Sequence, residues 1–280
     1  MERETIIYFY PVSEQQKKAG RVTAAKRFWF RNVSLGVRYL GGCQNEFNIA
    51  GCPVPPFYCR NKPWKPQILS ALMEDALCHA EGLADTFLHP QIAAMLTDEY
   101  NKRWIPRRST VQMIVKNLME QHASRVVARN GEAVVLLGGV ADTGWQMETT
   151  RELLLPYLPR INRLLIFYEE ITGTDIWMEL GNHLDDYYYE YGLVPQLEPY
   201  TEAADGLRCG KPKCSGIILD YCEKFRYPKI MPDSAAVYID MVSEEDKERL
   251  LARKSLRTTY VSPLKYLDTM VKNSYDGLVN

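Results

Sequence analysis

The chain has 280 residues, 46% of them hydrophobic, which is enough for one large domain or two ordinary ones with an apolar core. Its 34 Lys and Arg residues nearly balance its 35 Asp and Glu residues, so the basic excess that is usual in nucleic-acid-binding domains is absent and no nucleic-acid partner is expected. The sequence has no apolar run of membrane-spanning length and no signal-peptide pattern, which, with its seven cysteines, favours a cytoplasmic protein with reduced thiols and no membrane contact.

The first part of the chain is expected to be mainly helical. A strand is predicted over Thr5–Val12, which is rich in β-branched and aromatic residues, and a helix after Ser13, a residue type favoured at helix N-caps. Further helices are predicted over 66–85, 90–103 and 109–129. Residues 41–66 contain five prolines, three glycines and three cysteines, and we expect an irregular Cys- and Pro-rich loop there. We therefore predict a mainly helical N-terminal domain over residues 1–130.

Strands and helices alternate after a turn at Asn130–Gly131. The strands are predicted at 133–139, 163–170, 192–199, 215–222, 235–242 and 258–263. The helices are predicted at 147–161, 174–191, 243–255 and 264–278. Several of the strands are apolar without alternation, as is typical of central strands in a parallel sheet that helices cover on both faces. The predicted fold class is therefore α/β, with a doubly wound, mostly parallel sheet over residues 131–280.

A glycine-containing turn follows the first of these strands. Its glycines would let backbone amides and a helix N-terminus approach a ligand phosphate, because a Cβ atom would block that approach. The two residues before the third glycine are placed to cap the next helix, and the next strand ends in two glutamates that can accept hydrogen bonds from ribose hydroxyls. The predicted cofactor-binding residues are Gly138, Gly139, Asp142, Thr143, Gly144, Glu169 and Glu170.

This order of strand, glycine turn, helix and acidic strand end resembles the Rossmann-type dinucleotide-binding domain of dehydrogenases, over about residues 132–280. The resemblance implies NAD or another adenine nucleotide as cofactor, and two adjacent carboxylates would repel the 2′-phosphate of NADP. The glycine spacing is G-G-x-x-x-x-G where the family has G-x-G-x-x-G, and the glutamates lie beyond the usual distance of about 20 residues. The alternative is that the glycines only permit a sharp turn and that the site is absent or degenerate.

No motif defines catalytic residues. Asp240, at the end of a predicted strand, and Lys265, after the last strand, are the candidates on position alone. The chain is therefore interpreted as a dehydrogenase-like enzyme or as a catalytically silent pseudoenzyme. Cys209 and Cys214 come closest to the spacing of a zinc-binding pair, with ordinary reduced thiols as the alternative.

A second hypothesis is a protein-interaction scaffold without enzymatic activity. Its partner surface would be the Cys- and Pro-rich loop, whose aromatic residues are candidate anchors for another protein or a second copy of the chain: Phe47, Phe57, Tyr58 and Trp64. Both hypotheses predict the same fold, so the fold alone does not distinguish them.

Overall fold

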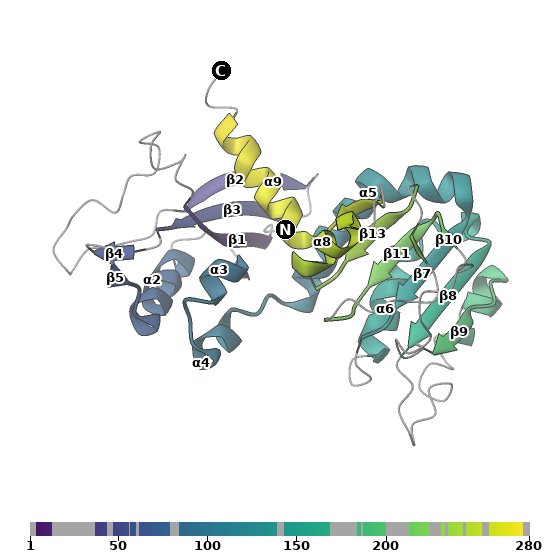
Figure 1. Cartoon of the computed structure of the whole chain (residues 1–280), viewed down its shortest axis with the longest axis horizontal. Coiled ribbons are helices and arrows are strands. Elements are labelled where there is room, and N and C mark those ends of the chain that lie inside the picture. Colours follow the sequence, from purple (N-terminus) through teal and green to yellow (C-terminus); the bar gives the residue numbers. More distant parts are fainter. Residues whose placement is uncertain are drawn as a thin grey trace. The chain divides into compact units, whose positions relative to one another are not determined.

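The structure is a computed structural model of the whole chain (Figure 1). It describes residues 4–12, 37–43, 47–55, 57–59, 62–78, 84–138, 143–168, 184–185, 187–199, 213–223, 231–232, 235–242, 245–253 and 258–276. By its internal contacts the chain divides into two compact units. The first unit combines Met1–Val111 with Leu267–Asn280, and the second unit is Gln112–Tyr266. The chain therefore leaves the first unit once and returns to it at its end.

The first unit contains a four-stranded mixed sheet. The strands follow the order β2 (Arg38–Cys43), β3 (Phe47–Val54), β1 (Glu4–Pro11) and β6 (Ala84–Leu88). β1 runs parallel to β3 and β6, whereas β2 is antiparallel to β3. A short antiparallel hairpin of β4 (Phe57–Cys59) and β5 (Lys62–Pro63) follows β3 along the chain. The strand predicted over Thr5–Val12 is confirmed as β1.

The expectation of a mainly helical N-terminal part is not confirmed, and the prediction of an irregular loop over 41–66 is wrong. β3 lies inside this range and pairs on both sides, and the side chains of Phe47, Ile49 and Cys52 are fully buried. The prediction was wrong because it took proline as a sign of a loop, whereas Pro53 lies where no hydrogen bond to β2 is needed. Pro53 lies beyond Gly51, the last residue of β3 that pairs with β2, so its missing N–H leaves no neighbour unsatisfied on that side.

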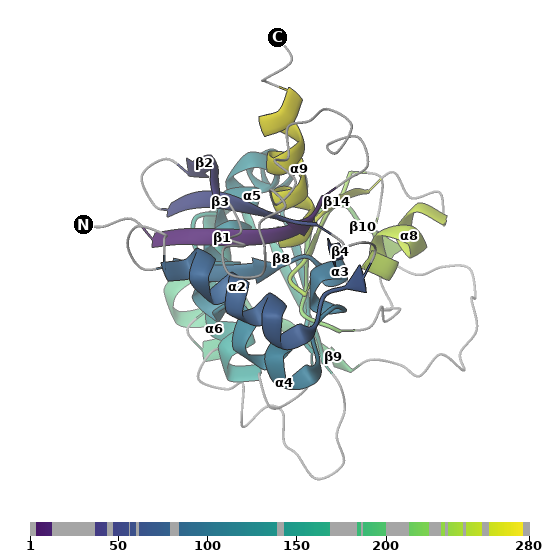
Figure 2. The ribbon, with the colours of Figure 1, turned by 90° about the vertical axis from the view of Figure 1, so that its left-hand side faces the viewer.

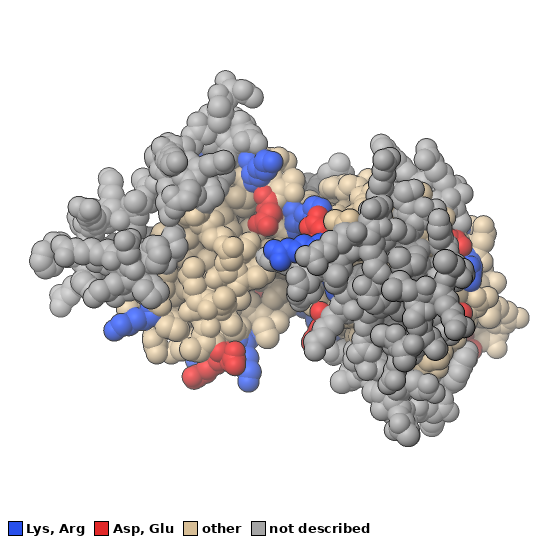
Figure 3. Space-filling view, viewed as in Figure 1, with Lys and Arg blue, Asp and Glu red and all other residues tan. Residues whose placement is uncertain are grey.

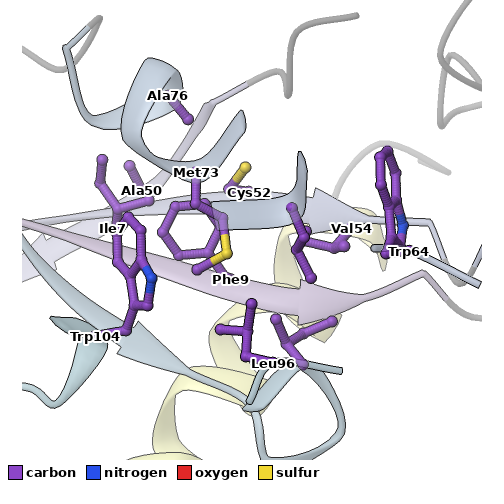
Figure 4. Close-up of a cluster of buried hydrophobic side chains, with 12 residues drawn as sticks. Ile7, Phe9, Ala50, Cys52, Val54, Trp64, Met73, Ala76, Leu96 and Trp104 are labelled. Carbon is purple, nitrogen blue, oxygen red and sulfur yellow. The ribbon is translucent and has the colours of Figure 1, made fainter. Parts of the chain in front are cut away.

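Helices cover both faces of this sheet (Figures 1 and 2). One face packs against α2 (Pro66–Cys78), α3 (Pro90–Ala93) and the segment of α4 (Asp98–Asn101) and η1 (Lys102–Trp104). The helix predicted over 90–103 is therefore broken into short pieces. Figure 4 shows the apolar core on this face, in which Phe9 packs edge-on against Trp104 with ring centroids 5.9 Å apart.

The opposite face is covered by the last helix, α9 (Pro263–Asp276). Leu267 and Val271 of α9 are buried, and the Tyr8 hydroxyl donates a 2.5 Å hydrogen bond to the Asp268 carboxylate. Burial first, and the Asp268 charge second, raise the pKa of Tyr8 far above its ordinary value, so this phenol stays protonated. The bond fixes α9 to the centre of β1.

The second unit is built on a six-stranded sheet in which every pair of neighbours is parallel. The strand order is β14 (Thr259–Val261), β13 (Val237–Asp240), β11 (Ile217–Asp220), β7 (Glu132–Leu136), β8 (Arg163–Tyr168) and β9 (Gln196–Pro199). The side chains of β7, β11 and β13 are buried on both faces except for that of Glu132, as the uninterrupted apolar runs predict. The α/β class and the parallel sheet are thus confirmed.

Helices lie on both faces of this sheet. α6 (Thr143–Leu154) meets one face where Thr150 hydrogen-bonds Tyr221, and α8 (Glu245–Arg253) meets the other, where Leu251 joins an apolar cluster with Tyr238. The unit also contains η3 (Leu158–Arg160) and the two-stranded parallel pair β10 (Lys213–Cys214) and β12 (Met231–Pro232). No helix in the described ranges is both long enough and apolar enough to cross a membrane.

The long helix α5 (Arg108–Asn130) runs across the division between the two units and ends where the sequence predicts a turn. Gly131 has φ +59°, a left-handed conformation that favours glycine, and its N–H caps the helix at the Val127 carbonyl, 3.1 Å away. The boundary predicted near residue 130 coincides with the end of α5, whereas the two compact units divide within this helix, between Val111 and Gln112.

Candidate functional site

The carboxyl ends of β7, β11 and β13 lie side by side at one edge of the six-stranded sheet. Leu136, Asp220 and Asp240 are in register across these strands. In open α/β sheets this edge is where ligands bind, outside the strands and near the helix N-termini. The candidate site is therefore built here, from the turn after β7, the start of α6, and the segments that follow β11 and β13.

Gly138, in the turn after β7, has a packing role. A Cβ atom on it would lie 2.5 Å from the backbone oxygen of Tyr221, so any other residue would collide with the segment after β11. The Gly138 N–H donates a 2.9 Å hydrogen bond to the side-chain oxygen of Gln146 in α6. This amide is therefore engaged within the protein, whereas Gly139 and Asp142 lie outside the described residues.

Thr143 and Gly144 form the start of α6. Gly144 is exposed, and a Cβ atom built on it meets nothing within 4 Å. Packing against the residues that the structure describes thus gives no reason for glycine at this position. The first amides of a helix have no intrahelical partner and attract anions, so a ligand phosphate would find donors here.

The buried side of α6 is unusually polar for a helix that packs on a sheet. Gln146, Thr149 and Thr150 are all buried, and the Thr150 hydroxyl lies 3.0 Å from the Tyr221 hydroxyl. Trp145 packs edge-on against the Tyr221 ring, with centroids 5.8 Å apart. These contacts join the start of α6 to the segment after β11 and fix the shape of this part of the edge.

A buried lysine lies at the same sheet edge, on the face that α8 covers. Lys247 of α8 is fully buried, and its ammonium lies 2.9 Å from a carboxylate oxygen of Asp220 and 2.9 Å from one of Asp240. It also donates to the backbone oxygen of Cys222. These three acceptors use all three donors of an ammonium group. We call Lys247, Asp220 and Asp240, with the tyrosines that bond them, the Lys247 network.

Both carboxylates of the Lys247 network accept further hydrogen bonds. Each binds the backbone N–H two residues ahead: Asp220 that of Cys222 at 2.8 Å, and Asp240 that of Val242 at 3.1 Å. The Tyr238 hydroxyl donates to Asp220, and the Tyr260 hydroxyl donates to Asp240 at 2.7 Å. The aspartates therefore determine how the chain turns after two adjacent strands, and they bind β13, β14 and α8 together.

The protonation states follow from burial and from the partners. Burial raises the pKa of Asp220 above its ordinary value, although the Lys247 charge opposes this shift. Burial lowers the pKa of Lys247, but the two carboxylates outweigh it and the net shift is upward. Burial, followed by the adjacent carboxylate, also raises the pKa values of Tyr238 and Tyr260. Lys247 is thus cationic and both tyrosines are neutral at physiological pH.

Asp240 and Lys265, the two positional candidates for catalysis, meet at Tyr260. Asp240 accepts its hydroxyl, whereas the Lys265 ammonium lies 3.3 Å from its backbone oxygen and 5.4 Å from its ring centroid. Lys265 is half exposed and forms an ion pair with Glu248. Asp240 is completely buried and, in this conformation, holds the strand ends without reaching solvent.

The acidic pair Glu169 and Glu170 and the candidate metal ligand Cys209 lie outside the described residues. Cys214, in β10, is a buried cysteine in the apolar cluster of the second unit. In the described part of the chain, no three His, Cys, Asp or Glu side chains are grouped so as to hold a metal ion.

Two of the four aromatic anchors proposed for a partner surface are in the interior. Phe47 is fully buried, and Trp64 is almost so, with its indole N–H donating to the Pro55 oxygen at 2.6 Å. Phe47 is buried because it belongs to the central strand β3, which the prediction of a loop missed. On the face drawn in Figure 3, the basic and acidic side chains of the described residues lie close to one another and do not separate into large patches of one sign.

The sequence reasoning missed Asp220, Tyr238 and Lys247. A signal for the aspartates was present: two apolar strands end in "ILD" and "YID", so each places an aspartate at its carboxyl end. Lys247 had no such signal, because "SEEDKERL" has the composition of a solvated helix.

No known protein-family model matches this chain, and no curated protein sequence matches it significantly.

Proposed function

We propose that the second unit is a Rossmann-type domain that binds an adenine dinucleotide, NAD in the first place, at the carboxyl edge of its sheet, and that the protein is a dehydrogenase-like enzyme or a pseudoenzyme derived from one. The observation that carries the proposal is the strand order. Numbered along the chain within the six-stranded sheet, the strands lie in the order 3-2-1-4-5-6. That is the order of doubly wound dinucleotide-binding sheets, in which the ligand lies where the order reverses.

The start of α6 supports the same proposal. β7 is the first strand of the unit and the central one from which the order reverses, and the turn after it leads directly into α6. The open space at Gly144 would let a pyrophosphate approach the first amides of this helix. Because the Gly138 amide already bonds Gln146, the proposed contacts begin at Thr143 and Gly144 and not at Gly138.

A thermal-shift panel of NAD, NADP, S-adenosylmethionine, ATP and FMN tests the proposal. A ligand present at about 100 times its dissociation constant stabilises the folded state by about 2.7 kcal/mol, which such an assay detects readily. We expect NAD to raise the midpoint temperature of unfolding. NADP should raise it less, since Glu169 and Glu170 would repel its 2′-phosphate. A panel in which every ligand leaves the midpoint unchanged would contradict the proposal and favour the scaffold.

Gly144→Val locates the site. The Cβ atom of the added side chain has no described residue within 4 Å, so we expect a folded variant whose midpoint temperature of unfolding no longer responds to NAD. Glu148→Val is the matched control, because it places the same side chain at an exposed position one turn further along α6. Retained NAD binding in Gly144→Val would show that the ligand does not approach the start of the helix.

A further inference from the structure

The side-chain amide of Gln146 is held in one orientation. Gln146 belongs to the first turn of α6, is only 4% exposed, and accepts the Gly138 N–H at its side-chain oxygen, 2.9 Å away. Because a backbone N–H can only donate, the oxygen must face Gly138 and the NH2 group must take the other position of the amide. The side chain therefore presents a fixed pair of N–H donors.

These donors lie at the turn after β7. A Cβ atom on Gly138 would come within 3.2 Å of the Gln146 side-chain nitrogen, so this nitrogen lies beside the Gly138 backbone. Side chains in a helix lean toward its N-terminus, which brings the Gln146 amide from the first turn of α6 back to the strand end. The NH2 group is therefore close to the helix start, where the ligand pyrophosphate is proposed to bind.

The NH2 group of Gln146 needs an acceptor. Among the described residues, the hydrogen bond from Gly138 to the oxygen is the only one that the Gln146 side chain makes. A buried amide N–H without an acceptor has a free-energy cost, because it has lost its bonds to water and nothing replaces them. The bond from Gly138 also polarises the amide and makes its N–H groups stronger donors. A ligand oxygen at the start of α6 would supply the acceptor.

Resting on the proposed function, we propose that Gln146 binds the pyrophosphate of the dinucleotide through its side-chain NH2 group. Gly138 orients this amide without touching the ligand, so the donor of its own backbone acts on the phosphate through the glutamine. Hydrogen bonds to charged oxygens are stronger than neutral ones, and the loss of this bond should weaken binding roughly tenfold to a hundredfold. Gln146 thus favours ligands that carry a phosphate at the helix start.

Isothermal titration of the full chain with ADP-ribose compares the unaltered protein with Gln146→Glu. The variant keeps the side-chain shape and an oxygen for the Gly138 N–H, but an ionised carboxyl has no donor and repels a pyrophosphate. In mildly alkaline buffer we expect binding weaker on the order of a hundredfold. At lower pH the new carboxyl takes up a proton, its O–H becomes a donor, and the affinity should recover. Gln67→Glu makes the same change at an exposed position of α2 and should alter neither the affinity nor its pH dependence.

The outcomes separate this inference from the proposed function. If the unaltered protein does not bind ADP-ribose, both are overturned. If it binds, equal affinity of a folded Gln146→Glu variant in alkaline buffer, or a loss of affinity that lower pH does not reverse, overturns the inference alone. If the variant does not fold, a crystal structure of the unaltered protein with ADP-ribose decides. The Gln146 nitrogen should then lie about 3 Å from a phosphate oxygen, and a nitrogen beyond hydrogen-bond distance overturns the inference.

Discussion

The interior of the first unit and the carboxyl edge of the second are equally buried but chemically opposite. The core on the α2 face of the first unit is an apolar cluster around Phe9 and Met73, both with no exposed surface (Figure 4). The Lys247 network is just as inaccessible, yet it holds three charged side chains. Burial of the first kind stabilises the fold directly, whereas burial of the second kind has a desolvation cost that the hydrogen bonds must offset. The two kinds of burial therefore contribute to stability through different balances of favourable and unfavourable terms.

The carboxylates of the two units show the same contrast. Asp268 in the first unit bonds Tyr8, but its side chain is 48% exposed. Asp240 bonds Tyr260 in a similar way and is fully buried. A carboxylate can thus anchor an element without leaving water, which makes the complete burial of Asp220 and Asp240 a specific property of this sheet edge.

The largest effect is expected from removing one partner of the network. Lys247→Met removes the ammonium that two buried carboxylates share, and the loss of such a buried partner costs about 3–5 kcal/mol. Chemical denaturation followed by circular dichroism measures this loss. The matched control adds Asp220→Asn and Asp240→Asn to the same chain, and it should recover part of the stability because no charge remains unpaired. A loss of stability below about 1 kcal/mol in Lys247→Met would contradict the view that the buried carboxylates of the network depend on the lysine.

A cavity in the apolar core of the first unit should have a somewhat smaller effect. Met73 is fully buried between α2 and the sheet, so Met73→Ala is expected to cost about 2–4 kcal/mol. The comparison variant Gln67→Ala changes an exposed position of the same helix and should stay within about 0.5 kcal/mol of the unaltered protein. Equal stability of the two variants in denaturation would show that this face does not pack as a core.

Alkaline pH should reduce the contribution of the Lys247 network to the free energy of unfolding, by less than the loss expected from Lys247→Met. Tyr238, Tyr260 and Lys247 have pKa values raised above their ordinary 10.0, 10.0 and 10.5 in the folded state. Their contribution to stability is complete below those ordinary values and is lost as the pH rises above them, because only the unfolded chain releases the protons. Each group lowers the free energy of unfolding by about 1.4 kcal/mol per pH unit in that range.

Tyr260→Phe sharpens this prediction. The variant loses the hydrogen bond to Asp240, at a cost of about 1–2 kcal/mol at neutral pH, and one group that titrates above pH 10. Urea denaturation at a series of alkaline pH values gives the slope of the unfolding free energy against pH. We expect this slope to be smaller by about 1.4 kcal/mol per pH unit, which corresponds to one proton. An unchanged slope would mean that Tyr260 ionises equally in the folded and unfolded states.

The smallest effect is expected at the surface. Arg103 and Glu74 form an ion pair at 3.4 Å, but their side chains are 63% and 53% exposed. Arg103→Ala should cost no more than about 0.5 kcal/mol, and moderate salt should abolish the difference from the unaltered protein. A loss of stability in Arg103→Ala as large as that in Lys247→Met would show that burial does not explain why the two ion pairs differ in strength.

The fold of the second unit could be predicted from the sequence because its elements have strong local signals. The apolar runs of β7, β8, β11 and β13 and the turn at Gly131 appear where the residues indicate them. The first unit was harder because its central strand, β3, contains two features that usually break a strand. A Cβ atom at Gly51 would lie 2.8 Å from Leu40 and 3.0 Å from Tyr10, and Pro53 lies past the end of β2. The neighbouring strands therefore explain both residues, and the local sequence does not.

The candidate site was predictable only in part. Gly138 and Gly144 stand in the same turn region, but the sequence could not separate a glycine that packing requires from one that packing leaves open. The Lys247 network depends on α8 packing onto the ends of β11 and β13, a tertiary contact with no local pattern. The composition of the helix predicted at 243–255 gives no indication that Lys247 is buried, and position alone selected Asp240 without its partners.

The most direct measurement is a crystal structure of the protein with ADP-ribose. Our account predicts the pyrophosphate at the start of α6, within hydrogen-bond distance of the backbone amide of Gly144 and clear of Gly138. ADP-ribose bound away from the carboxyl edge of the six-stranded sheet, or crystals that remain free of it at saturating concentration, would contradict the assignment of a dinucleotide site to this unit.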